Sequence, residues 1–103
     1  MSLIDEIRAK VAAGHFEFSQ HAVDQTLQRD ITVAEIIEAI GVGEMIEDYP
    51  NDKYGPSCLI FGYTKAKRAL HVQCSYPSRP LLKVITIYEP DPDRWIEFRL
   101  RKP

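Results

Sequence analysis

Hydrophobic residues recur at the three- and four-residue spacing of an amphipathic helix in three places in the first half of the chain. The predicted helices cover residues 2–13, 19–29 and 32–41. Each begins at a residue whose side chain can accept a hydrogen bond from a free backbone N–H, namely Ser2, Ser19 and Thr32. Thr32 and Glu35 also have the spacing of a capping box, so the third start is the most specific.

The hydrophobic period changes to two in the second half of the chain. Segments rich in β-branched and aromatic residues predict strands at residues 45–49, 57–64, 69–76 and 82–88. The basic stretch 65–68 between two of them predicts a hairpin turn. Pro90 and Pro92 end the last strand, because proline cannot donate to a strand ladder. In the tail, Ile96, Phe98 and Leu100 alternate with charged residues, which predicts a fifth short strand or an extended arm.

Helices followed by strands are typical of the α+β class, with the helices on one face of the sheet. We expect one domain over residues 1–103, with two to three helices on a sheet of four antiparallel strands, or five if the tail joins it. The other face of the sheet would stay partly open, and a functional site could lie there.

Alternation also assigns side chains to the two faces. If the hairpin centres on Ala66, Cys58 lies opposite Cys74 on the buried face, and Ile85 and Ile87 of the last strand share that face. The cysteines are then small buried hydrophobic residues rather than a disulfide or a metal pair. The spacing of the histidines and cysteines matches no zinc motif, so we expect no metal and no cofactor.

The open face carries the polar residues of the last two long strands. His71, Gln73, Thr86 and Tyr88 all fall on it. The imidazole can transfer a proton or be an ordinary surface side chain, and the phenol can donate a proton or mark the sheet rim. These alternatives stay open on the sequence alone.

Two further polar residues lie on the second predicted helix. His21 occupies its first turn, where free backbone N–H groups disfavour the charged imidazole. Arg29 ends the helix and either binds an anion or only favours the helix C-terminus.

Charge is divided unequally between the two halves of the chain. Residues 1–52 hold eleven acids and three bases, a net charge of −8, and residues 53–103 hold four acids and ten bases, a net charge of +6. The basic sheet half can attract phosphate or an acidic protein chain. The isoelectric point of about 5.9 argues against strong general binding to nucleic acids.

The longest apolar run, residues 58–61, is too short to span a membrane, and no secretory signal is visible. Two cysteines without such a signal indicate reduced thiols. We therefore expect a cytoplasmic protein without membrane contact.

Several short motifs together resemble the bacterial DUF4258 family over about residues 16–95. They are Phe18-Ser19-x-His21-Ala22, then Arg29 and Ile31, Pro56-Ser57-Cys58-Leu59-Ile60-x-Gly62, Leu70-His71-Val72, Val84-Ile85-Thr86-x-Tyr88-x-Pro90 and Trp95. That family is grouped with the RelE-like and barnase-like (BECR) small ribonuclease folds, many of which are toxins of toxin–antitoxin pairs.

The resemblance implies helices on a four-stranded antiparallel sheet and a metal-independent endoribonuclease. The polar positions that match the family are His21, Arg29, His71, Thr86 and Tyr88. On this basis we expect His71, His21, Tyr88 and Arg29 to act in catalysis. Substrate binding would fall to Thr86, Lys83, Gln73 and Arg68. One position departs from the family pattern, because Gln25 stands where a basic residue often follows the helix histidine.

The alternative is a binding module without catalysis, which docks RNA, an acidic antitoxin-like protein or a second copy of itself. A third hypothesis is a structural role, in which His21, Arg29 and Tyr88 lock a helix to the sheet.

Overall fold

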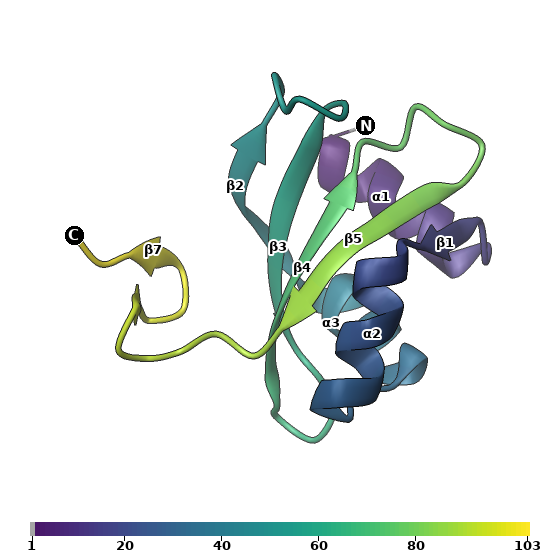
Figure 1. The fold of residues 1–103 in the computed structure, drawn as a ribbon. Coiled ribbons are helices and arrows are strands. Elements are labelled where there is room, and N and C mark those ends of the chain that lie inside the picture. Colours follow the sequence, from purple (N-terminus) through teal and green to yellow (C-terminus); the bar gives the residue numbers. More distant parts are fainter. Residues whose placement is uncertain (1) are drawn as a thin grey trace.

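Three helices lie side by side on one face of a mixed sheet in the computed structural model, which describes residues 2–103 (Figure 1). The helices are α1 (Leu3–Ala12), α2 (Gln20–Arg29) and α3 (Val33–Val42). The strands are β1 (Phe16–Phe18), β2 (Glu44–Tyr49), β3 (Ser57–Tyr63), β4 (Ala69–Ser75), β5 (Leu82–Tyr88), β6 (Trp95–Ile96) and β7 (Leu100–Arg101). The predicted α+β class, with helices before the long strands, is confirmed.

The predicted helix starts are confirmed in detail. The side chains of Ser2, Ser19 and Thr32 each accept from a backbone N–H in the first turn, and Thr32 and Glu35 form the capping box. The second helix ends at Asp30, which takes the left-handed conformation common at helix C-termini (φ 52°).

The main sheet has five strands in the order β1-β5-β4-β3-β2. Four of them form the predicted antiparallel ladder, in which Cys58 pairs with Cys74 as expected. The prediction of a purely antiparallel sheet is wrong, because β1 adds to the edge in parallel with β5, pairing Phe16 with Leu82 and Phe18 with Val84. Three residues are too few to show a strand period, and their partner strand lies far along the chain.

A bulge in β5 overturns the predicted face of Ile85. Cys74 pairs with Val84 and Gln73 with Thr86, so Ile85 is an extra residue on β5. Val84 and Ile87 are both fully buried in the core, and Ile85 is only half-buried. A bulge reverses the alternation locally, which a strict two-residue period does not anticipate.

Close approach of α3 to β3 fixes the layer of helices on the sheet. A Cβ atom on Gly62 would lie 2.0 Å from the carbonyl oxygen of Ala39, so only glycine fits there. The core between the layers includes Ile7, Ile36, Ile40, Ile60 and Val72, all at most 1% exposed.

The tail does not add a fifth strand to the sheet. Strands β6 and β7 pair with each other, and Figure 1 shows the resulting hairpin on the side of the sheet opposite the helices. We call residues 95–101 the C-terminal hairpin. Its tight turn is closed by Arg99 N–H donating to the Ile96 carbonyl at 2.9 Å, and both central residues have positive φ, Glu97 at 51° and Phe98 at 61°. Side chains other than glycine and asparagine are strained there.

None of the helices over residues 2–103 has the length and apolar character needed to cross a membrane.

Candidate functional site

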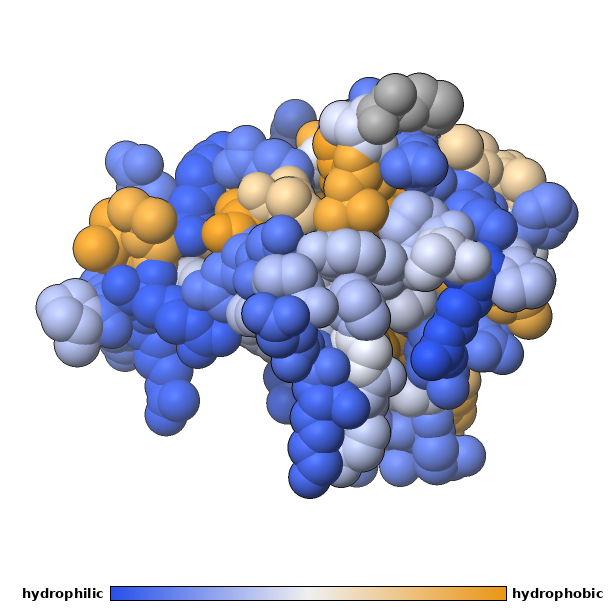
Figure 2. Space-filling view, turned by 90° about the horizontal axis from the view of Figure 1, so that it is seen from above, coloured by the Kyte–Doolittle hydropathy of each residue, from blue (hydrophilic) through white to orange (hydrophobic). Residues whose placement is uncertain are grey.

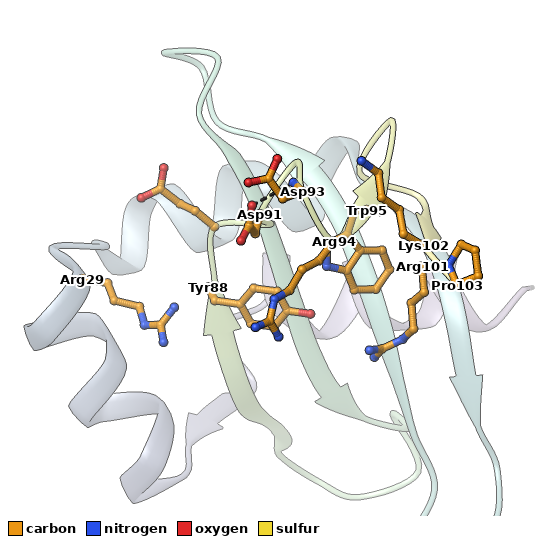
Figure 3. Close-up of a pocket in the computed structure, with 10 residues that line it drawn as sticks. Arg29, Tyr88, Asp91, Asp93, Arg94, Trp95, Arg101, Lys102 and Pro103 are labelled. Carbon is orange, nitrogen blue, oxygen red and sulfur yellow. Dashed lines mark hydrogen bonds between the residues drawn. The ribbon is translucent and has the colours of Figure 1, made fainter.

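A cavity of about 720 Å³ opens where α2, the end of β5 and the C-terminal hairpin meet (Figure 3). The rings of Tyr88 and Trp95 line it. So do four cationic side chains, those of Arg29, Arg94, Arg101 and Lys102, and three carboxylates, those of Glu89, Asp91 and Asp93. Its lining therefore combines positive charge with two aromatic surfaces.

Hydrogen bonds between α2 and β5 bring Arg29 and Tyr88 to the same place. Ser19 donates its hydroxyl to the Ile85 carbonyl at 2.9 Å, and the Gln25 side-chain oxygen accepts from Ile87 N–H at 2.7 Å. These bonds supply partners for backbone groups at the edge of β5, beyond the residues that pair with β1. The helix is thus held along the strand, and the last residues of both elements, Arg29 and Tyr88, reach the cavity.

Gln25 consequently has a structural role. It is 6% exposed, and its carboxamide oxygen serves the backbone of β5. The absence of a cation at this position leaves the cavity unchanged, because Gln25 does not line it.

His71 and Tyr88 pair across β4 and β5, and the phenol oxygen lies 3.1 Å from Nδ1 of the imidazole. The other ring nitrogen, Nε2, lies 2.7 Å from the Phe98 carbonyl oxygen, which can only accept. Nε2 therefore carries the proton of a neutral ring, and Nδ1 accepts the proton of the Tyr88 hydroxyl.

The expectation that His71 faces solvent is wrong. It does lie on the face opposite the helices, but it is fully buried beneath the C-terminal hairpin. The Trp95 ring meets the imidazole edge-on, with centroids 4.4 Å apart. Burial lowers the pKa of His71, outweighing the hydrogen bond to Phe98, and this keeps the ring neutral. Burial also raises the pKa of Tyr88, so its hydroxyl keeps its proton.

Two ion pairs and aromatic contacts hold the hairpin on the sheet. Arg101 binds both carboxylate oxygens of Glu47, at 2.8 and 3.1 Å, and its guanidinium lies over the Trp95 ring. Burial raises the pKa of Glu47, but hydrogen bonds from Arg101 and Tyr49 outweigh it and leave the pKa below its usual value. Arg99 pairs with Glu44 at the tip of the hairpin.

Three of the cations around the cavity are available to a ligand. Within residues 2–103, the side chains of Arg29, Arg94 and Lys102 make no hydrogen bond or ion pair. Figure 3 shows Arg29 and Arg94 extending toward the Tyr88 ring, whereas Asp91 and Asp93 lie together at another part of the rim. Asp91 accepts from Asp93 N–H at 2.8 Å, which fixes that turn.

Arg68 is already occupied. Its guanidinium donates to the carbonyls of Arg29 and Asp30 at the end of α2 and pairs with Glu35 and Glu89. Five interactions from one side chain join the end of α2, the start of α3 and the end of β5. Arg68 therefore holds in place the elements that form the cavity wall, without lining the cavity itself.

The other sequence-predicted site residues lie outside this cavity. His21 is exposed on α2, eight residues before Arg29, which is about 12 Å along a helix. Gln73 donates to the Ser57 hydroxyl at 3.2 Å, and Thr86 pairs with Gln73 across the strands. Lys83 lines a smaller hollow at the opposite end of β5.

No group of three or more metal-ligating side chains forms among residues 2–103. Cys58 and Cys74 are free thiols inside the core, where the hydrogen bond to Cys58 and burial raise the pKa of Cys74.

Of the ten residues that line the cavity, sequence reasoning found Arg29 and Tyr88 and missed eight, including Arg94, Trp95, Arg101 and Lys102 of the tail. The tail did show a signal in its bases alternating with Ile96, Phe98 and Leu100. That signal favours a strand but does not say that the strand folds back over His71.

A family model described as "Domain of unknown function (DUF4258)" matches residues 18–89. The match includes α2 and β5, and it ends before the C-terminal hairpin. Comparison with curated proteins found no match, and neither did comparison with solved structures.

Proposed function

The chain belongs to the DUF4258 family, and from its own cavity we propose that it is a small RNA-binding domain that cleaves RNA without a metal ion. The observation that carries this proposal is the Tyr88 hydroxyl in a cavity with three unpaired cations and bonded to a neutral imidazole. An RNA phosphate needs the cations, and a 2′-hydroxyl needs a group that takes its proton. A relation of this chain to the RelE-like ribonucleases is part of the same proposal.

Cleavage would follow the usual transesterification. The 2′-oxygen attacks the adjacent phosphorus, the bond from phosphorus to the 5′-oxygen breaks, and a 2′,3′-cyclic phosphate forms. The 2′-proton passes to the Tyr88 oxygen as Tyr88 passes its own proton to Nδ1 of His71. The departing 5′-oxygen takes a proton from water, and the hydroxide that remains takes the proton of Tyr88 as His71 returns its extra proton to the Tyr88 oxygen.

The residues at the cavity have different roles in this reaction. Tyr88 is the catalytic residue, because its oxygen would touch the reacting hydroxyl. His71 is a positioning residue that acts through Tyr88, since the hairpin covers its ring. Arg29 and Arg94 stabilise the negative charge that grows on the phosphate oxygens in the transition state.

The test is RNA cleavage in EDTA by the parent protein and by Tyr88→Phe. The variant keeps the ring and loses only the hydroxyl, so we expect at least about a hundredfold loss of rate, in the range that general acid–base groups contribute. Tyr63→Phe, which removes an exposed phenol hydroxyl at the end of β3 away from the cavity, is the control. Lack of cleavage by the parent, or equal cleavage by Tyr88→Phe, would sink the proposal.

A second candidate is a docking function without catalysis, toward an acidic antitoxin-like chain or a second copy of the protein. Exposed apolar residues on α2 and α3 favour it, because Leu27 is 78% exposed and Val42 is 72% exposed. Light scattering on the purified protein tests the second copy. If the protein stays monomeric at all concentrations, self-association is excluded, and the docking function then requires a different protein as partner.

A further inference from the structure

A second hollow lies at the other end of β5, between the loop that follows β2 and the loop that precedes β5. Its volume is about 230 Å³, and its lining includes the side chains of Arg79, Lys83, Tyr54 and Tyr76. Figure 2 looks onto the end of the molecule where these loops lie, and most of the surface there is hydrophilic. The hollow thus repeats the chemistry of the first cavity, with two cations beside aromatic rings.

Both cations of this second hollow are available. In the part of the chain from Ser2 to Pro103, neither Arg79 nor Lys83 has its side chain in an ion pair. The carboxylate in the lining, Asp52, accepts from the Ser57 hydroxyl at 2.8 Å. The Tyr54 ring is 81% exposed and can stack on a flat ligand.

The bulge in β5 places this hollow on the same face as Tyr88. Ile85, the extra residue, lines the hollow together with Lys83 instead of entering the core. Lys83 and Tyr88 are five residues apart on β5, but the bulge between them leaves four steps of the ladder, which corresponds to about 14 Å. The two sites therefore lie along one strand at a separation that a short oligonucleotide can bridge.

A third hollow of about 560 Å³ has one lining residue in common with each of them. It shares Arg101 with the cavity at Tyr88 and shares Asp52 with the hollow at Lys83, and Gln73 lies in its lining. Shared residues thus link the three depressions in sequence, with polar groups in the middle one and, among residues 2–103, cations free of ion pairs at both ends.

We propose that Arg79 and Lys83 form a second phosphate-binding subsite, so that the substrate is an extended single strand of RNA lying along β5. The proposal rests on the proposed function, because it takes the cavity at Tyr88 as the first subsite. A single strand fits better than a duplex, since its phosphates can follow one strand while its bases stack on exposed rings such as Tyr54. A mononucleotide reaches only one of the two ends.

The test measures binding of labelled RNA by fluorescence anisotropy, with a dinucleotide and a decamer, in EDTA and with 2′-O-methyl RNA to prevent cleavage. The parent should bind the decamer more tightly. The double variant R79A/K83A should lose about tenfold in affinity for the decamer, as expected for two exposed charge contacts. Its salt slope should fall by about 1 to 2, and its binding of the dinucleotide should stay unchanged.

A matched control removes the same charge elsewhere on the sheet half. K65A/K67A alters two exposed lysines of the turn between β3 and β4 and should leave decamer binding as in the parent. Equal loss in both double variants would show general attraction and overturn the subsite, as would no loss in R79A/K83A. A duplex of the same sequence that competes equally would overturn the single-stranded substrate.

The outcome separates the two proposals. If binding increases with RNA length and R79A/K83A weakens it, the subsite is supported even when the parent cleaves no RNA. In that case only the proposed catalytic step is overturned. Failure of the parent to bind any RNA overturns both. Circular dichroism of each variant confirms that the fold is retained.

Discussion

The hydroxyl of Tyr88 donates to Nδ1 of His71 across 3.1 Å, and the two residues are direct partners on neighbouring strands. The imidazole is held from behind by the Phe98 carbonyl, so both ring nitrogens have defined partners. Only Tyr88 reaches the cavity. The pair therefore presents a phenol whose proton already points to an acceptor, and its stability depends on a neutral imidazole.

The first prediction concerns acid stability. Burial lowers the pKa of His71 below the ordinary value of 6.5, so the unfolded chain binds a proton more readily than the folded protein does. The stability contributed by the neutral ring is complete above pH 6.5 and is lost as the pH falls below it. We expect the melting temperature to fall between about pH 7 and pH 5.

His71→Gln isolates this effect, because its amide N–H can replace the bond to Phe98 without titrating. Its melting temperature should be lower at neutral pH and should change less with acid. The controls are His15→Asn and His21→Asn, both at exposed positions. A parent-like pH dependence in His71→Gln would contradict the assignment.

The second prediction concerns the C-terminal hairpin as a cover on His71. Diethyl pyrocarbonate should modify exposed His15 and His21 quickly and His71 slowly. Arg101→Ala removes the pair with Glu47 and the contact with Trp95, together about 1 kcal/mol. Mass spectrometry should then show His71 modified about fivefold faster, with Lys102→Ala as control.

A second variant, expected to slow the modification of His71, complements this experiment. Glu97 has φ 51°, which glycine adopts without strain, so Glu97→Gly should stabilise the turn and slow the modification of His71. If both variants change the rate in the same direction, the hairpin does not control access to the ring.

The third prediction concerns Gln25. Replacing it by alanine leaves Ile87 N–H buried without a partner, which should lower the free energy of unfolding by about 1–3 kcal/mol in urea melts. Gln28→Ala, at an exposed position of the same helix, should change it by less than about 0.5 kcal/mol. Equal effects at the two positions would mean that the bond to β5 contributes nothing.

The fourth prediction compares two glycines. Gly62→Ala places a Cβ atom 2.0 Å from the Ala39 carbonyl oxygen and should destabilise the protein by about 3 kcal/mol or more, because α3 must move off β3. Gly41→Ala has nothing within 4 Å and lies in a helix, so it should stabilise by up to about 1 kcal/mol. Denaturant midpoints of the two variants should shift in opposite directions.

Features with local causes could be predicted from the sequence. Thr32 and Glu35 determine a helix start within four residues, and the short basic turn sets the register that pairs Cys58 with Cys74. Each depends on residues close together in the chain. The sequence also singled out His71, Tyr88 and Arg29, two of which line the cavity.

Features with distant causes could not be predicted. The three residues of β1 become a strand only because Leu82–Val84 offers an open edge, and Ile85 changes face because β4 and β5 pair with a bulge. The tail folds back because Arg101 meets Glu47, a residue 54 positions away. No periodicity within the tail contains that information, so the burial of His71 and the cations that the tail brings to the cavity were missed.

The direction in which the chain leaves the C-terminal hairpin matters to anyone who handles the protein. Lys102 and Pro103 lie in the lining of the cavity beside Tyr88. A purification tag or reporter domain joined to Pro103, which is exposed, would begin at the wall of that cavity and compete with an oligonucleotide for it. The opposite terminus leads into α1, which packs on the other side of the sheet (Figure 1). Fusions there leave the cavity open, so they suit binding and cleavage assays.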